Sequence, residues 1–150
     1  MGTATLRISE ESTIRKLIED RVEAIRAKNV EKATAFLAPD VISFDVIDPL
    51  AYSGKDIVKK RLSEWFASFQ GDMLGFEITE LKITADEHVA FCRSLNKVKG
   101  VMKNGKPLEM YWRATICFEK IGGEWLSTHE HSSVPFDPET GKASLDLKPQ

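Results

Sequence analysis

The chain of 150 residues lacks long apolar runs and any strong excess of charge. Its 21 basic and 23 acidic residues give a formal net charge of −2. We therefore expect neither nucleic acid nor an anionic membrane surface as a partner. No apolar run approaches the roughly 20 residues that cross a bilayer, and the first residues contain no apolar segment of signal-peptide length. The sequence predicts a cytoplasmic protein without a membrane partner.

Cysteine is also scarce, and several chemical signatures are missing. Cys92 and Cys117 lie in separate strand-like runs and form no CxxC pair, so they are predicted to be buried free thiols in a reducing compartment. The chain has no glycine-rich phosphate loop, no GxSxG elbow and no sequence context for a cysteine nucleophile. No cofactor is expected.

What the chain does contain is a set of helical patterns followed by a set of strand patterns. Apolar residues at helical spacing predict helices at 10–28, 31–37 and 53–69, with caps at Ser9 and Ser53. Alternating and β-branched runs predict strands at about 41–47, 75–85, 89–101, 108–120 and 124–134. Residues 1–150 are expected to form a single domain, with a core at about 10–137 and a loose polar tail.

Helices first and a long antiparallel meander second indicate the α+β class. We expect a cone-shaped, curved antiparallel sheet with the three N-terminal helices packed on its concave face. Such a cone is a natural place for a small-molecule site. The opposite face would need a cover, and a homodimer is the usual solution.

The last strand carries the most informative pattern. Side chains alternate faces along a strand, which places on one face Trp125, Ser127, His129, His131 and Ser133. The two histidines would point the same way, about 7 Å apart along the backbone. This polar face predicts the floor of a pocket. The alternative is a histidine pair that is hydrogen-bonded inside a polar core or a dimer face.

The order of elements, together with Trp-x-x-x-His-x-His-x-Ser-x-Pro-Phe from Trp125 to Phe136, resembles the SnoaL-like and ketosteroid-isomerase-like proteins of the nuclear-transport-factor-two-like superfamily. The resemblance covers about residues 10–137. It implies the cone fold but no single activity, since the superfamily contains isomerases, cyclases, dehydratases, transport adaptors and a kinase association domain.

The resemblance suggests an aspartate on the first strand as a general base. Counting from the second helix places Asp45 there, whereas alignment on Val46-Ile47-Asp48-Pro49 would place Asp48 there. Strand parity favours Asp45, because it shares a face with Ser43. A carboxylate in an apolar cone would have a raised pKa, which suits proton transfer near neutral pH. The alternative is an aspartate that caps a turn or forms a salt bridge.

The other half of the isomerase pattern is missing. The family's oxyanion hole uses a tyrosine on the first helix, but residues 10–28 contain none and Arg21 lies near that position. The second acid of the hole would fall near Arg113 or Thr115. The chain is therefore not a ketosteroid isomerase by its residues.

Basic side chains stand where those donors would be. Arg113 could hold an anion through two hydrogen bonds, while His129 and His131 could act with Asp45 as acid, base or orienting groups. Arg113 and Trp112 lie on opposite faces of their strand, so at most one lines the cavity. Two histidines and an aspartate could also hold a metal, but a metal-free site is the preferred interpretation.

Further ligand contacts are predicted from Trp65, Trp112, Asn96 and Ser133. For the two tryptophans the alternative is plain core, where aromatic residues at such spacing are more often found, and for Asn96 the alternative is a surface position. The preferred function is small-molecule binding, with cofactor-free acid–base chemistry of the isomerase, cyclase or dehydratase type on an apolar ligand bearing a carbonyl or acidic group. Whether the protein is an enzyme stays open. The alternative is a non-catalytic ligand-binding or assembly domain.

Overall fold

The computed structural model describes residues 3–150, without the side chains of residues 3 and 5–7. Helices and strands follow the predicted order with one addition, a short strand that precedes the third helix. Their bounds are α1 Thr3–Arg26, α2 Val30–Ala33, β1 Leu37–Phe44, β2 Tyr52–Ser53, α3 Lys55–Ala67, β3 Gly75–Ala85, β4 Val89–Val101, β5 Pro107–Ile121 and β6 Glu124–Ser133. No helix among these residues is long and apolar enough to cross a membrane.

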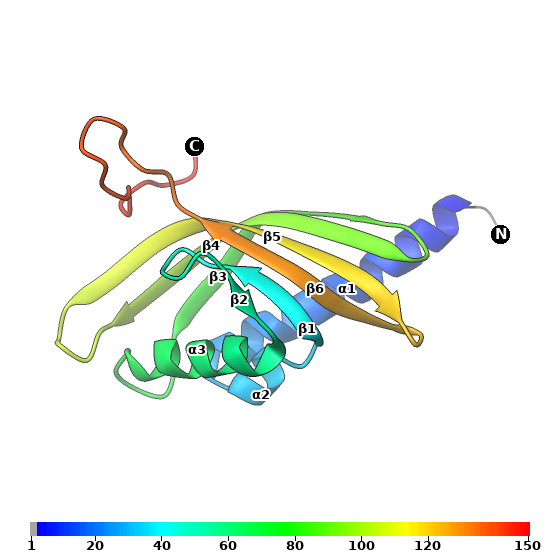
Figure 1. The fold of residues 1–150 in the computed structure, drawn as a ribbon, viewed down its shortest axis with the longest axis horizontal. Coiled ribbons are helices and arrows are strands. Elements are labelled where there is room, and N and C mark those ends of the chain that lie inside the picture. Colours follow the sequence, from blue (N-terminus) through cyan, green and yellow to red (C-terminus); the bar gives the residue numbers. More distant parts are fainter. Residues whose placement is uncertain (1–2) are drawn as a thin grey trace.

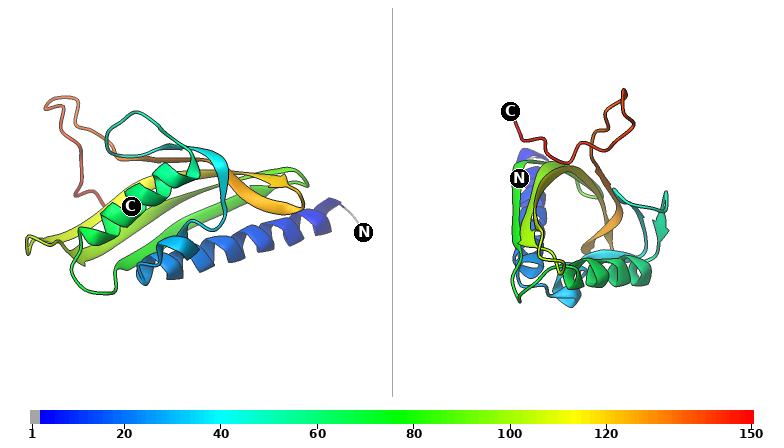
Figure 2. Two further views of the ribbon diagram at one scale, coloured as in Figure 1. Left: turned by 60° about the horizontal axis from the view of Figure 1, so that its bottom comes forward. Right: turned by 90° about the vertical axis from the view of Figure 1, so that its left-hand side faces the viewer.

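One six-stranded sheet has the order β2-β1-β6-β5-β4-β3 (Figure 1). The meander from β3 to β6 is antiparallel, as predicted, but β1 pairs with β6 in parallel, so the sheet is mixed rather than antiparallel. Short turns impose antiparallel pairing only on strands that follow one another, and β1 reaches β6 from far along the chain. The sheet curls around the helices, which confirms the cone fold (Figure 2).

Three local expectations were wrong at the helix ends. Helix α1 begins at Thr3, so Ser9 lies inside it, and the segment predicted as a helix at 31–37 is helical only at Val30–Ala33. The chain extends into β1 at Leu37 because β1 pairs with β6 from that residue onward. The residue before α3 is Gly54 and not Ser53, which was expected to cap the helix. Gly54 has a φ of 100°, a conformation that glycine adopts readily.

Two groups of buried apolar side chains fill the space between helices and sheet. One surrounds Ile14 and Ile18 of α1, and the other surrounds Phe66 and Phe69 at the end of α3. The alternate residues of β4 from Ala90 to Val98 face these groups, and so do their cross-strand partners on β5. This pattern identifies the concave face of the sheet residue by residue.

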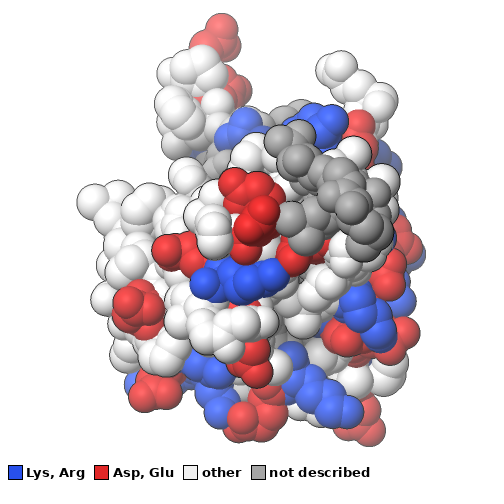
Figure 3. All heavy atoms as spheres, turned by 90° about the vertical axis from the view of Figure 1, so that its right-hand side faces the viewer, with Lys and Arg blue, Asp and Glu red and all other residues white. Residues whose placement is uncertain are grey.

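A partly buried carboxylate, that of Glu10, fastens α1 to the β5–β6 hairpin. Glu10 accepts hydrogen bonds from Lys120 Nζ at 2.7 Å and from the Trp125 indole N–H. Basic and acidic side chains lie next to one another over this end of the molecule (Figure 3). The hydrogen bond from Lys120 is the main reason why the pKa of Glu10 lies below its usual value of 4.5. Burial opposes this effect, and the hydrogen bond from Trp125 adds to it.

Glu10→Gln is expected to lower the free energy of unfolding by about 1 kcal/mol near pH 7. A lowered native pKa stabilises the fold above the unfolded pKa, and the stabilisation disappears as the pH falls through the native pKa. The difference between wild type and variant should therefore shrink as the pH falls below the usual range of a glutamate carboxyl and vanish once the native carboxyl is protonated. Urea unfolding across this range measures it, with exposed Glu23→Gln as the control. A difference that persists in acid would contradict this account of Glu10.

Candidate functional site

A β-bulge in β6 decides which side chains face the concave side. Phe118 pairs with Ser127 while its neighbour Cys117 pairs with His129, so Thr128 is an extra residue in the ladder. Beyond such a bulge, the alternation of faces shifts by one residue. The predicted common face for Ser127 and His129 is therefore wrong. Ser127 is fully buried with the core, whereas His129 and His131 lie on the convex side.

The convex side holds the two histidines next to Phe44 of β1. The centroid of the Phe44 ring lies 4.6 Å from that of His129 and 5.4 Å from that of His131, and the two imidazoles lie 6.3 Å apart. His129 Nδ1 lies 2.7 Å from the Ile42 carbonyl oxygen, which can only accept a hydrogen bond. This contact places the proton of the neutral ring on Nδ1 and leaves Nε2 as the acceptor.

The question between Trp112 and Arg113 is also settled by register. Trp112 pairs with buried Asn96 and faces the helices, while Arg113 is exposed and donates from Nε to Ser133 Oγ at 3.1 Å. Arg113 and Ser133 thus share the convex side. They therefore lie on the opposite face of the sheet from Trp112 and Asn96, with which the sequence analysis grouped them as ligand contacts.

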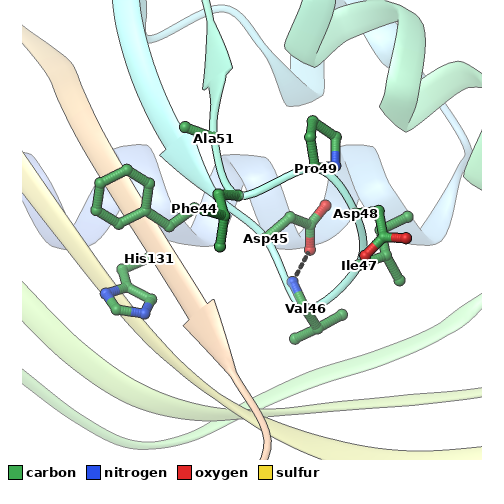
Figure 4. A pocket seen from close by; sticks show the side chains of 9 residues that line it. Phe44, Asp45, Val46, Ile47, Asp48, Pro49, Ala51 and His131 are labelled. Carbon is green, nitrogen blue, oxygen red and sulfur yellow. Dashed lines mark hydrogen bonds between the residues drawn. The ribbon is translucent and has the colours of Figure 1, made fainter.

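Asp45 and Asp48 both lie in the loop between β1 and β2, outside the cone. The loop and His131 line an open hollow of about 560 Å³ (Figure 4). Asp45 is exposed, and its carboxylate accepts a hydrogen bond from the Val46 N–H at 2.7 Å. The expectation of an apolar environment for Asp45 is therefore wrong. Strand β1 ends at Phe44, so Asp45 belongs to the loop and no longer follows the alternation of the strand. Asp45 and His131 do line the same hollow.

The concave face carries a group of small and polar side chains, of which the sequence analysis had predicted only Asn96 as a ligand contact. In one row across three strands, Ala114 of β5 has Ser94 of β4 and Ser132 of β6 as its neighbours. Such small side chains cannot fill the centre of a sheet as Leu or Phe would. We call this group the concave polar floor, and it comprises Ser43, Ser94, Asn96, Ala114, Glu130 and Ser132.

An ion pair joins this floor to α1. The Arg21 guanidinium donates to both carboxylate oxygens of Glu130, from Nη1 in a short contact and from Nη2 at 3.3 Å. The side chains are only 19% and 11% exposed, and the guanidinium also lies over the Phe36 ring at 5.1 Å. Arg21 Nε is buried without a hydrogen-bond partner among the described residues. The sequence pointed to Arg21, which lies near the tyrosine position of the family. It did not point to Glu130, because regular alternation along β6 places that residue on the other face.

The other side of the floor is bordered by Asn96 and tryptophans. Ser94 Oγ donates to Asn96 Oδ1 at 2.7 Å, and Asn96 is 9% exposed, so its predicted alternative as a surface residue is wrong. Trp112, its cross-strand partner, meets Trp65 of α3 edge-on with ring centroids 6.2 Å apart. Both tryptophans are half-buried and pack against the second apolar group. They therefore belong to the core and also border the concave polar floor.

The cysteines are free and are not prepared as nucleophiles. Burial raises the pKa of Cys92 to about 11, against the weaker opposing effect of its backbone hydrogen bond, and burial also raises the pKa of half-buried Cys117. Both therefore stay thiols near neutral pH. Among the described residues, no three His, Cys, Asp or Glu side chains are grouped so that they could hold a metal.

Comparison with known proteins agrees with the fold. The family model of the SnoaL-like domain matches residues 14–137. An NTF2-like protein of unknown function from Pseudomonas putida KT2440 is 33% identical, with a TM-score of 0.87 over 96% of this chain and 99% of that chain. None of the curated proteins compared with the chain matches it.

Two more distant solved structures share the fold alone. A ketosteroid isomerase-like protein from Erwinia carotovora atroseptica is 20% identical, with a TM-score of 0.69 over 83% of this chain and 95% of that chain. The association domain of CaMKII from C. elegans is 15% identical, with a TM-score of 0.64 over 85% and 97% of the two chains. On its family match and its 33% identical relative, this chain belongs to the SnoaL-like family of NTF2-like proteins.

Proposed function

We propose that this protein binds a small, largely apolar molecule on the concave polar floor. The observation that carries the proposal is the row Ser94–Ala114–Ser132, flanked by the Arg21–Glu130 ion pair, in the middle of the face where a purely structural core would be apolar. Small and polar side chains in this position offer hydrogen-bonding groups to a ligand and take up less space than Leu or Phe would.

The energetics of the ion pair support a role other than stability. Burying two charges costs several kcal/mol per ion, and a well-packed apolar pair of similar volume is often as stable or more so. The residues around the floor are also within reach of solvent: Ser94, Trp112, Ser132 and Arg21 are all half-buried. A ligand could therefore approach the floor without the removal of a fully buried side chain.

Any chemistry at this floor would be acid–base work of the isomerase, cyclase or dehydratase type. Glu130 supplies a carboxylate and Arg21 a fixed cation beside it. Of the predicted ligand contacts, Trp65, Trp112 and Asn96 suit this site, whereas Arg113 and Ser133 lie on the convex side. The catalytic roles of Asp45, His129 and His131 stay predictions, attached to the outer hollow rather than to the floor.

A ligand-detected NMR screen of aromatic acids, enones and lactones tests the proposal. We expect binding at micromolar to millimolar concentration that survives unchanged in His131→Ala and Asp45→Asn, because both residues lie outside the cone. Binding that is lost in both variants would move the ligand site to the outer hollow. No binding to wild type would contradict the proposal itself.

We also propose a homodimer, in which the convex side of the sheet meets a second copy. That side exposes aromatic rings that the described residues leave uncovered, with Phe91 50% and Phe44 38% exposed. Exposed apolar side chains on one sheet face favour association. The similarity to an association domain is consistent with this role, and the expected cytoplasmic location stays a prediction.

Phe91→Lys is expected to shift the protein from dimer to monomer, because it places a charge in the proposed interface. Light scattering behind size exclusion measures the mass, and Ile57→Lys serves as a control because it places the same charge on an exposed apolar residue of α3, outside the sheet. A wild-type monomer would contradict the dimer proposal and leave the ligand proposal intact.

A further inference from the structure

We infer that the two copies of the dimer exchange the segment that follows β6, so that residues 134–150 of one copy lie on the convex side of the sheet of the other copy. We call this segment the arm. The inference rests on the proposed homodimer and adds the segment and the surface that join the two copies. The concave polar floor takes no part in it.

The arm has a shape of its own, although none of its residues is buried. Phe136 and Ala143 form an antiparallel bridge, and the Ser144 N–H donates to the Pro135 carbonyl oxygen at 2.8 Å, so residues 135–144 make a small hairpin. Figure 1 shows this hairpin clear of the helices and of the sheet. Its backbone is therefore arranged before any partner binds, which lowers the entropy that docking would cost.

Three apolar side chains of the arm lie in solvent. Phe136 is 65% exposed, Leu147 52% and Leu145 46%. Apolar side chains that gather on one exposed segment favour association with another surface.

The arm stands on the side of the sheet where the second copy is proposed. In the right-hand view of Figure 2, the arm and α3 lie on opposite sides of the sheet. Glu109 points to the convex side of β5, and its pKa is lowered chiefly by the hydrogen bond from Lys97. Lys148 of the arm adds to this lowering, so the end of the arm also lies on the convex side. A copy that approaches this side therefore meets the arm.

The middle of the convex side carries positive charge. Lys82 of β3 and Arg93 of β4 lie opposite each other, and Arg113 of β5 lies diagonally from Arg93. All three are exposed, and none of them forms an ion pair within the described part of the chain. Like charges opposite each other on neighbouring strands are unfavourable, so this surface favours an acidic occupant.

Charge also decides between direct packing of two sheets and packing through the arms. In a two-fold dimer the same patch lies on both sides of the interface, so two convex sides in direct contact would bring their cations together. The arm carries two lysines and three acids, which are Asp137, Glu139 and Asp146. Its apolar side chains suit the exposed rings of Phe44 and Phe91. The arm of a second copy thus offers this surface both acidic and apolar groups.

Leu145→Ser/Leu147→Ser in the full chain should raise the dissociation constant of the dimer by about a hundredfold, because two apolar side chains leave the interface. Light scattering over a dilution series measures this constant. Both leucines are exposed within their own chain, so circular dichroism should show an unchanged fold. Ile57→Ser is the matched control, since Ile57 is 45% exposed on α3, away from the convex side.

Arg93→Glu separates docking of the arm from direct contact between sheets. If the acidic arm lies on this surface, the reversed charge should weaken the dimer by about tenfold or more. Direct contact between two positive patches predicts the opposite, because the change removes a repulsion across the interface. A dimer that is unchanged or tighter in Arg93→Glu would overturn the inference.

A photo-crosslinker identifies the surface that the arm touches. With p-benzoylphenylalanine in place of Phe136, irradiation should give a covalent dimer whose crosslinks map to β4, β5 or β6 of the other copy. The same group in place of Ile57 should give none. A dimer that forms no such crosslink, or that keeps its affinity in Leu145→Ser/Leu147→Ser, would overturn the exchange of arms alone. A wild-type monomer would overturn the dimer with it, while the NMR screen decides ligand binding separately.

Discussion

Replacing Arg21 with methionine is expected to lower the free energy of unfolding by about 2 kcal/mol, because it leaves the Glu130 carboxylate in the core without its cation. The figure lies below the range for fully buried pairs, since both side chains keep some contact with solvent. Methionine retains the length of the side chain and its packing on Phe36, so the loss reports mainly on charge. Chemical denaturation near neutral pH measures it.

A double-mutant cycle separates the ion pair from other effects of the substitution. Glu130→Met alone should destabilise by a similar amount, and Arg21→Met/Glu130→Met should cost less than either single change, because no unpaired charge remains. Strictly additive losses would show that the two side chains act independently, which would contradict their pairing across the concave face.

The second large effect is expected on ligand binding. Ala114→Leu should weaken binding of any ligand of the floor by at least about thirtyfold, a loss of roughly 2 kcal/mol, because the larger side chain would project from the concave face between Ser94 and Ser132. Titration of the best compound from the NMR screen measures the change.

Stability and the control variant keep this result interpretable. Ala114 is only 8% exposed, so a leucine there is expected to cost some stability, and the unfolding of Ala114→Leu is measured beside its affinity. Thr115→Leu places the same side chain one residue along the strand on the exposed convex side and should bind as wild type does. Ligand affinity that is unchanged in Ala114→Leu would contradict the site.

The long elements could be predicted from the sequence because their patterns are local. The meander from β3 to β6 follows from alternation and turn residues within each hairpin, and the structure confirms its bounds closely. The pairing of β1 with β6 is parallel and joins segments far apart in the chain, so no local turn chemistry announces it.

The site could be predicted only in part, and Thr128 is the reason. One extra residue in β6 reverses the expected faces of His129, Glu130 and His131. The histidines that were predicted to form a pocket floor lie outside the cone, and Glu130, which regular alternation places on the face opposite the histidines, forms the ion pair inside it. Nothing in the residues around Thr128 distinguishes a bulge from a regular strand, since no glycine marks it.

The predictions on β4 and β5 fared better, because those strands keep a regular register. Asn96 and Trp112 occupy neighbouring positions on the concave face, and Arg113 takes the opposite face, as strict alternation requires. Strict alternation therefore placed Trp112 and Arg113 on opposite faces correctly, while the centre of the proposed floor, Ala114 with two serines, has no chemical signature that a sequence pattern would single out.

One NMR measurement tests the central claim most directly, because each of the two candidate sites contains an alanine methyl group. Ala114 lies in the concave polar floor and Ala51 lines the outer hollow. With protein labelled on alanine methyls and the best compound from the NMR screen bound, we predict a nuclear Overhauser effect from the ligand to Ala114 and none to Ala51. An effect to Ala51 without one to Ala114 would place the ligand outside the cone and contradict the account.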